Sequence, residues 1–339
     1  MSNTKCAMIT GGSRHIGQGI AIALAEYGYD IAITYATSLD GAKETQRQIE
    51  ELGRRCFIYE AHLEQPEIPE KVINQARADL GRLDVMICNA GKDVRSSVLT
   101  ATTEDLDYLY ANNLRNYFLC VGAAARHMVN DKTEGSIIMI TSVRGQLPHP
   151  DDFYYGGIKA AMDRACKSMA LDLSAYNIRV NCIAPGAIWK SGRDGEIPST
   201  PFLRESIPLH RSGYVRDIGE AAAFLAGERS AYITGITLLV DGGLALPGLL
   251  EQHDAIPWDY PQRKGKTHKQ AMDMLKKSQE AQLEQARQTE FEDSKIKQKI
   301  CPKCGDRLTA FVKDGETWVS CDNYYCRWEK CTGETAEQK

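Results

Sequence analysis

Tyr155 and Lys159 are two residues that could move a proton together. They stand four positions apart in the segment YYGGIK, so on a helix both side chains project from the same face. A free tyrosine has a pKa of about 10, and a neighbouring ammonium group favours the phenolate and lowers that value. The pair therefore predicts a general acid/base. Tyr154 is the competing hydroxyl, but it lacks the four-residue spacing to Lys159.

Further polar residues stand where apolar runs end. Ser142 closes the run GSIIMIT thirteen residues before Tyr155, and Asn89 closes another run, with Asn113 in the helical segment that follows. Tyr-x-x-x-Lys spacing alone is common on helices, so these neighbouring motifs decide its meaning. Ser142 therefore stands where its hydroxyl could meet a ligand near the Tyr155–Lys159 pair.

A glycine-rich turn near the start of the chain could hold a dinucleotide. Gly11, Gly12 and Gly17 lie between an apolar run and a helical pattern in CAMITGGSRHIGQGIAIALA. Glycines let the backbone turn sharply and approach a pyrophosphate, while the following helix offers free N–H groups and its positive dipole end. The turn occupies the first strand-to-helix junction, where a nicotinamide dinucleotide site is expected.

The residues expected beside the adenosine ribose favour NADP(H) over NAD(H). Enzymes that use NAD usually place an acidic residue at the end of the second strand. This chain has YATS at positions 35–38 and no carboxylate before Asp40, while Arg14 lies in the glycine turn. A guanidinium group and hydroxyls suit a 2′-phosphate. The alternative is that Arg14 is a solvated surface residue and the turn accepts NAD.

Seven short apolar runs, alternating with helical patterns, must position these residues. Most runs are continuously apolar, as strands covered on both faces are. The alternation predicts an α/β fold with a doubly wound, seven-stranded parallel sheet of the Rossmann type. The runs are CAMIT, DIAITY, RCFIYEA, LDVMICNA, GSIIMIT, IRVNCIAP and TLLVDGG.

Composition and patterning set the remaining limits. The chain has 339 residues and a formal net charge of -4, which excludes a globally basic nucleic-acid binder. No apolar run is long enough to span a bilayer, and the first residues lead straight into a strand, so we expect a cytoplasmic protein without membrane contact. We expect a Rossmann domain over 1–247, a connector and a charged helix over 248–299, and a cysteine-rich domain over 300–332.

The motifs together resemble those of classical short-chain dehydrogenases/reductases over residues 5 to 246. The segments LDVMICNAG and YITGITLLVDGG are similar in sequence to segments of glucose 1-dehydrogenases and 3-oxoacyl-[acyl-carrier-protein] reductases. The matching motifs, in family order and spacing, are Thr10-Gly11 with Gly17, Asn89-Ala90-Gly91, Asn113, Ser142, Tyr155-x-x-x-Lys159, Pro185-Gly186 and Asp241-Gly242-Gly243.

The resemblance implies a role for each catalytic residue. Tyr155 would be the general acid/base, Lys159 would lower its pKa and hold the nicotinamide ribose, and Ser142 would hydrogen-bond the substrate oxygen. Asn113 would support a water that relays protons toward Lys159. The cofactor residues implied are Gly11, Ser13, Arg14, His15, Ile16, Gly17, Tyr35, Thr37, Ser38, His62, Leu63, Asn89, Ala90, Gly91, Tyr155, Lys159, Pro185, Gly186 and Ile188.

Three positions depart from the family pattern. His15 replaces the middle glycine of the first turn, His62 replaces an acidic residue near the adenine, and Lys190 replaces a threonine. His15 could add a contact to the cofactor phosphates or simply be a solvated surface residue. The catalytic groups are untouched by these changes.

The substrate is expected to be a small carbonyl or alcohol. We expect a mobile loop over 189–211, and we expect Gln146, His149, Asp152 and Phe153 to face the substrate pocket. Polar groups there suit a sugar or polyol, and the resemblance adds a 3-oxoacyl-type substrate. Steroids, pteridines and quinones stay open. The family is mostly tetrameric, which implies a homo-oligomer.

The cysteines fall into two groups. Six are scattered through the first part as small core residues, and five lie in the last forty residues. Cys301 and Cys304 form a CPKCG knuckle, and Cys321 and Cys326 follow a predicted hairpin, so four thiolates predict a closed, structural Zn²⁺ site. Iron is the alternative, and Cys331 could substitute for Cys326.

The cysteine-rich end resembles the zinc ribbons at the C-termini of bacterial type I topoisomerases. Such ribbons can touch single-stranded DNA, and Trp318, Tyr324, Tyr325 and Trp328 could stack on bases. We prefer packing of these aromatics around the zinc or against the main domain. A second hypothesis for the whole chain is an NADP(H)-binding redox sensor that acts through the ribbon; the complete catalytic group favours an enzyme.

Overall fold

The computed structural model describes residues 4–189, 206–246, 284, 299–313, 316–322, 326 and 329–335. The chain divides into two compact units, Met1–Trp258 and Asp259–Lys339. The predicted connector and charged helix lie outside the described residues except at Glu284 and Lys299, and so does most of the predicted substrate loop with Lys190. The domain boundaries proposed from the sequence stay predictions.

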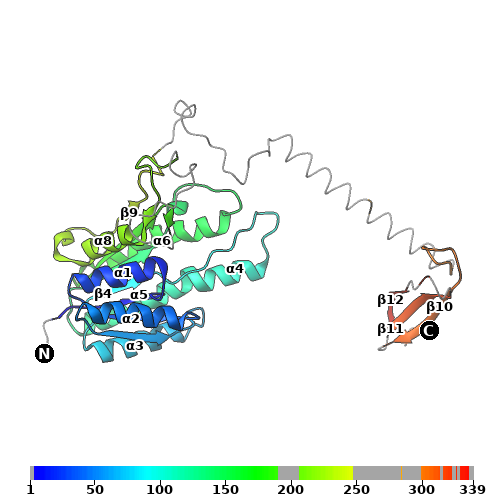
Figure 1. Ribbon diagram of the computed structural model, residues 1–339, viewed down its shortest axis with the longest axis horizontal. Coiled ribbons are helices and arrows are strands. Elements are labelled where there is room, and N and C mark those ends of the chain that lie inside the picture. The colour runs from blue at the N-terminus through cyan, green and yellow to red at the C-terminus, as the bar shows by residue number, and fades with distance from the viewer. Residues whose placement is uncertain are drawn as a thin grey trace. The chain divides into compact units, whose positions relative to one another are not determined.

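The first unit is built on a parallel sheet of seven strands in the order β3-β2-β1-β4-β5-β6-β9 (Figure 1). This confirms the predicted Rossmann-type architecture, since each of the seven apolar runs contains one strand. The strand order reverses between β1 and β4, and ligands of open α/β sheets bind at such a switch point. The strands are β1 Cys6–Ile9, β2 Asp30–Tyr35, β3 Cys56–Glu60, β4 Val85–Cys88, β5 Ser136–Ile140, β6 Arg179–Pro185 and β9 Thr237–Val240.

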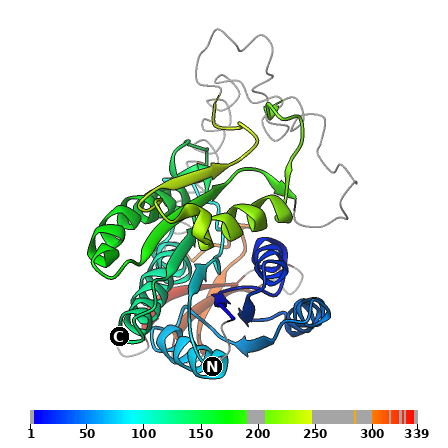
Figure 2. The same cartoon turned by 90° about the vertical axis from the view of Figure 1, so that its left-hand side faces the viewer.

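Helices cover both faces of this sheet, which explains why β1, β4 and β5 are buried at every position. One apolar cluster joins the sheet to α1 His15–Glu26, α2 Leu39–Glu51 and α8 Val215–Ala226. The other joins it to α3 Ile68–Leu80, α4 Thr103–Tyr110, α5 Asn116–Asn130 and α6 Phe153–Ser174 (Figure 2). No described helix is long and apolar enough to cross a membrane.

The segment that carries Asn113 departs from a regular α-helix. Residues Ala111–Arg115 form a π-helical turn, η1, between α4 and α5. Turns of this kind occur mostly as short insertions and often at functional sites. Helical spacing in the sequence predicts a helix there, but apolar periodicity does not distinguish one widened turn from its neighbours.

Short elements complete the first unit. Ser142 caps the 3-10 turn η2 Val143–Gly145 after β5, and η3 Glu228–Ser230 follows α8. Two two-residue strands, β7 Ile188–Trp189 and β8 Gly213–Tyr214, pair in parallel beyond the sheet.

The second unit contains a three-stranded antiparallel sheet in the order β10-β11-β12. The predicted hairpin is present as β10 Leu308–Lys313 and β11 Glu316–Cys321, and β12 Glu329–Thr335 pairs with β11. A single bridge between Ile300 and Arg307 closes the turn that carries the first two cysteines.

Candidate active site and candidate metal centre

The predicted site residues gather at the carboxyl ends of neighbouring strands. Thr10 and Gly11 follow β1, Asn89 follows β4, and Ser142 lies two residues beyond β5. Since β1, β4 and β5 are adjacent in the sheet, their ends meet at the switch point. The tertiary fold therefore brings together motifs that are far apart in the chain.

The Ser142 side chain lies beside the phenol of Tyr155 and acts to lower the pKa of that phenol. The Ser142 Oγ also accepts a hydrogen bond of 3.2 Å from the backbone N–H of Arg144, which orients it at the start of η2. The neighbouring Tyr154 points elsewhere, because its hydroxyl donates to the Leu106 carbonyl of α4 at 2.9 Å. Of the two tyrosines, Tyr155 is the one whose pKa Ser142 influences.

Lys159 is buried at the same place. Only 3% of the residue is exposed, and its Nζ donates a hydrogen bond of 3.1 Å to the carbonyl oxygen of Ile140, the last residue of β5. Burial lowers the pKa of Lys159 to about 8, because an apolar environment disfavours the charged form.

The expected lowering of the Tyr155 pKa is not found in this structure. Burial raises the pKa of Tyr155 to about 12, with a smaller raising effect from Asp93. Arg144 and the Ser142 hydroxyl act in the opposite direction but do not outweigh the loss of solvation. The four-residue spacing predicts that Tyr155 and Lys159 are neighbours, but the direction of each pKa shift depends on how deeply both side chains are buried.

Asn113 is buried and its side chain is bound to the backbone of Lys92. Its Nδ2 donates to the Lys92 carbonyl at 2.9 Å, and its Oδ1 accepts from the Lys92 N–H at 3.2 Å. These bonds fasten η1 to the segment that follows Asn89-Ala90-Gly91. The predicted water relay at Asn113 stays a prediction.

The glycine turn has the shape of a cradle for a pyrophosphate. Gly11 has a φ of +66°, in the left-handed region that favours glycine. A Cβ on Gly17 would overlap the Gly11 carbonyl oxygen and lie 2.5 Å from the Asn89 Nδ2. That amide donates to the carbonyls of Thr10 and Gly11 at 2.9 and 3.1 Å. No side chain caps the start of α1, and the positive dipole end of a helix attracts an anion.

The residues predicted to bind a 2′-phosphate are neighbours of this turn. Ser13 is buried, and its carbonyl oxygen packs against Gly41 in the first turn of α2, beside the Ser38 Oγ. Arg14 and Thr37 are exposed, and Tyr35 at the end of β2 is half-buried. His15 has a φ of +53°, so this histidine adopts the backbone conformation for which the family uses glycine.

The other predicted cofactor residues differ in their burial. His62 is half-buried between two carboxylates, with its Nδ1 3.4 Å from Glu64 and its Nε2 3.8 Å from Glu60. Leu63 is buried in the core, so its main chain rather than its side chain remains for an adenine. Ile16 and Ile188 are partly buried against the opposite core cluster, and the Gly186 N–H donates to Val240 at 3.1 Å.

Comparison with known proteins identifies the family. The family model described as Enoyl-(Acyl carrier protein) reductase matches residues 11–245. The 3-oxoacyl-[acyl-carrier-protein] reductase FabG of Staphylococcus aureus (strain N315) is 34% identical over 248 residues, covering 72% of this chain and 99% of the relative. The chain belongs to the short-chain dehydrogenase/reductase family.

Solved structures agree with this assignment of the chain as a dehydrogenase/reductase. The crystal structure of acetoin dehydrogenase YohF from Salmonella typhimurium has a TM-score of 0.69 and 35% identity, covering 73% of this chain and 98% of the other. The short-chain dehydrogenase/reductase from Serratia marcescens BCRC 10948 has a TM-score of 0.66 and 31% identity, covering 71% and 98%. The predicted oxidoreductase class is thereby confirmed.

Two features near the site were not predicted from the sequence of this short-chain dehydrogenase/reductase: the ion pair between Arg144 and Asp152, and the position of Tyr117. Arg144 lies two residues after Ser142, and its Nη1 is 3.1 Å from the Oδ1 of the buried Asp152. Asp152 was expected to face the substrate pocket, whereas its side chain is almost wholly enclosed. Tyr117 of α5 is buried beside Lys159; no local motif marks it, because α5 brings it there from 42 residues away.

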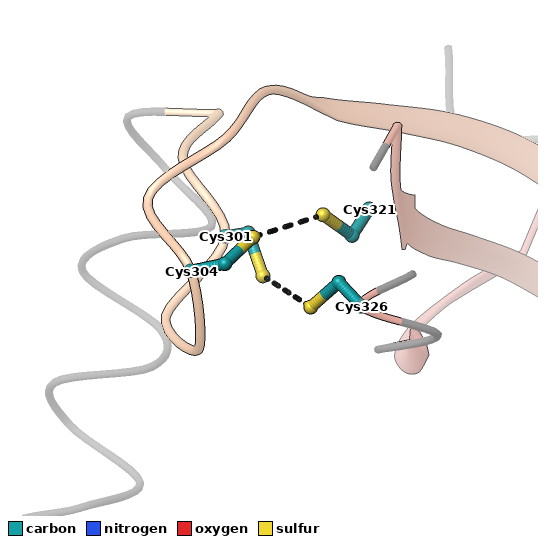
Figure 3. Close-up of side chains that lie close together, drawn as sticks. All are labelled: Cys301, Cys304, Cys321 and Cys326. Carbon is teal, nitrogen blue, oxygen red and sulfur yellow. Dashed lines mark hydrogen bonds between the residues drawn. The ribbon is translucent and has the colours of Figure 1, made fainter. Parts of the chain in front are cut away.

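The cysteines of the second unit form a compact cluster (Figure 3). The four Sγ atoms of Cys301, Cys304, Cys321 and Cys326 lie within 4.8 Å of one another. Although burial by itself raises the pKa of Cys301, the amides of Cys304 and Lys303 bring it down to about 7. Four thiol sulfurs at such distances suit one tetrahedral metal ion. Cys331 lies in β12, where its backbone pairs with Trp318.

Proposed function

We propose that this short-chain dehydrogenase/reductase is an NADP(H)-dependent oxidoreductase that interconverts a carbonyl and a secondary alcohol, with Tyr155 as the general acid/base. The observation that carries the proposal is the grouping of Ser142, Tyr155 and the buried Lys159, whose Nζ is 5.5 Å from the ring centroid of Tyr155, at the same sheet edge as the glycine cradle. Two hydroxyls and an ammonium group converge where a carbonyl oxygen would need stabilisation and a proton.

Each residue has a separable task in the reduction direction. Ser142 hydrogen-bonds the carbonyl oxygen, and Tyr155 gives its phenolic proton to that oxygen as negative charge develops there. Lys159 favours the tyrosinate that remains. A nicotinamide dinucleotide held by residues 11–17, Asn89-Ala90-Gly91 and Pro185 to Ile188 would supply the hydride. Oxidation of the alcohol uses the same groups in reverse.

Two features support the preference for NADP(H): the positive charge of Arg14, and the lack of a carboxylate at positions 35–38. Arg14 is exposed at the turn, Thr37 is exposed at the end of β2, and Ser38 lies beside the turn near Gly41. Asp40 is in the first turn of α2, beyond the position where NAD enzymes hold the ribose. Steady-state efficiency with NADPH and NADH tests the preference, and a clear NADH preference contradicts it.

The substrate proposed is a sugar, a polyol or a 3-oxoacyl-type compound. FabG is named a 3-oxoacyl reductase and the Salmonella relative an acetoin dehydrogenase, which supports a carbonyl with a second oxygen close by. Purified protein should be screened with 3-oxoacyl thioesters, hydroxyketones, aldoses and polyols while reduced nicotinamide absorbance is followed. No turnover with any carbonyl or alcohol would contradict the proposed reaction. The comparisons give no support to the redox-sensor alternative.

We also propose that Cys301, Cys304, Cys321 and Cys326 bind one structural Zn²⁺. Two chain turns present the four sulfurs around one point, which leaves no open position for a substrate or a catalytic water. A sheet as small as β10–β12 buries little apolar surface, so a metal would supply much of its stability. Elemental analysis of purified protein should find about one zinc per chain; iron in its place would support the alternative metal.

A homotetramer is the oligomeric state that we propose from the family. Light scattering coupled to size-exclusion chromatography measures the mass of the particle. A monomeric mass at micromolar concentration contradicts this proposal and leaves the proposed reaction open to its own test.

A further inference from the structure

The ammonium group of Lys159 lies between two tyrosine rings. Its Nζ is 5.2 Å from the ring centroid of Tyr117 and 5.5 Å from that of Tyr155. A cation within about 6 Å of an aromatic centroid is attracted by the negative face of the ring. Tyr155 belongs to the proposed reaction, whereas Tyr117 has no role in it so far.

Tyr117 and Lys159 also share a hydrogen-bond acceptor. The Tyr117 hydroxyl donates to the Ile140 carbonyl oxygen at 3.2 Å, and the Lys159 Nζ donates to the same oxygen at 3.1 Å. Ile140 is the last residue of β5, two residues before Ser142. One carbonyl thus connects the end of the catalytic strand to α5 through Tyr117 and to α6 through Lys159.

Because Lys159 is buried, an aromatic ring face beside it can stabilise its charged form. Burial lowers its pKa, and the groups that oppose this effect through charge are Cys182 of β6, Asp163 of α6 and Asp93 after β4. Within the described residues, none of these groups forms an ion pair with Lys159. Tyr117 is only 1% exposed, so its ring acts on the ammonium where water does not weaken the attraction.

We propose that Tyr117 is a positioning residue for proton transfer: its ring stabilises the charged form of Lys159, and its hydroxyl helps to hold the Ile140 carbonyl that receives the ammonium group. Tyr117 is not a second acid/base, because burial raises its own pKa far above the ordinary value and its hydroxyl is already used at Ile140. Its contribution to the reaction passes through Lys159, and in that respect this inference depends on the proposed function.

Two matched substitutions separate the ring from the hydroxyl. Tyr117→Phe keeps the ring face and removes only the hydrogen bond to Ile140. Tyr117→Leu removes both. A third variant carries pentafluorophenylalanine at position 117, which keeps the shape of phenylalanine and reverses the charge pattern of the ring. Its comparison with Tyr117→Phe tests the role of the ring even if Tyr117→Leu does not fold.

The pKa of Lys159 can be measured without turnover. Full-length protein labelled with 13Cε-lysine is titrated by NMR, and the Lys159 signal is assigned by its absence in Lys159→Arg. We expect Tyr117→Leu and the fluorinated variant to lower the Lys159 pKa by about 0.5–1.5 units relative to Tyr117→Phe. The pH at which Lys159 loses its charge in a kcat profile should move by the same amount.

An unchanged Lys159 pKa in all three variants would overturn the proposal, because a merely structural tyrosine would lower stability without moving this titration. An equal shift in Tyr117→Phe and in the fluorinated variant would also overturn the role of the ring. The proposed reaction fails separately: an absence of turnover in the unsubstituted protein contradicts that function, while the NMR titration still decides the role of Tyr117.

Discussion

The Nζ of Lys159 donates a hydrogen bond of 3.1 Å to the main-chain carbonyl of Ile140, so a charged group of α6 is held against the end of β5 inside the protein. The buried ammonium group of Lys159 destabilises the folded state, because burial lowers its pKa from 10.5 to about 8. Below pH 8 both the folded and the unfolded chain carry the proton, and the folded state bears the full penalty. The penalty decreases above pH 8 as the folded state loses the proton, and it is gone above about pH 10.5.

Lys159→Met should therefore stabilise the protein while it abolishes turnover. We expect the free energy of unfolding at pH 7 to rise by up to about 3 kcal/mol relative to the unsubstituted protein. The difference should shrink toward zero near pH 10.5, where neither folded state holds the extra charge. Urea unfolding of both proteins at the two pH values measures it. A difference that does not depend on pH would mean that packing, rather than buried charge, explains the change.

Tyr155→Phe should reduce kcat by a factor of about 10²–10⁴, because proton transfer to the substrate oxygen loses its donor. Cofactor affinity, measured by fluorescence of the bound reduced nicotinamide, should change little. Tyr154→Phe is the matched control, since that hydroxyl bonds Leu106 instead of Ser142; it should keep its kcat and lose about 1 kcal/mol of stability. Similar losses of kcat in both variants would contradict the assignment.

Gly17→Ala should prevent binding of the dinucleotide. The added methyl group would overlap the Gly11 carbonyl and crowd the Asn89 amide, so the turn must open at a cost of about 1–3 kcal/mol. Gly157→Ala is the control on α6, where an added Cβ meets nothing within 4 Å; it should stabilise the protein by about 0.5–1 kcal/mol. Calorimetric titration with NADPH and thermal unfolding measure both effects, and normal binding by Gly17→Ala would contradict the predicted cradle.

Arg14→Ala should weaken the preference for NADP(H). Loss of a charge-assisted hydrogen bond to the 2′-phosphate corresponds to a decrease of about 10- to 100-fold in kcat/KM with NADPH, with kcat/KM for NADH nearly unchanged. Arg164→Ala removes another exposed arginine, which bonds Ser168 on α6, and should leave the ratio of the two efficiencies intact. An unaltered ratio in Arg14→Ala would show that other groups select the cofactor.

Cys304→Ser should lower the zinc content of the purified protein well below one per chain, because the ion loses one of four thiolates. Cys331→Ser is the matched change, since Cys331 lies in β12 and is not one of the four clustered cysteines. It should keep about one zinc per chain. Retention of zinc by Cys304→Ser would contradict the four-thiolate site, and loss of zinc in Cys331→Ser would assign the fourth ligand to Cys331 in place of Cys326.

The pattern of residues along the chain was enough to predict the architecture and to place the candidate site residues at the ends of strands. Seven continuously apolar runs became seven strands because a sheet covered on both faces buries nearly every side chain. Ser142 and Asn89 were predictable because they stand where such runs end, and the carboxyl ends of adjacent parallel strands meet at the switch point. The spacing of Tyr155 and Lys159 was a local property of one helix.

The electrostatics of the site, in contrast, depend on the tertiary structure. The pKa values of Tyr155 and Lys159 shift away from the expected phenolate because both side chains are buried, and burial depends on every neighbouring element. Tyr117 reaches Lys159, and Asn113 reaches Lys92, through the packing of α5 and the π-helical turn before it. Such contacts join residues that share no sequence period, so no local pattern records them.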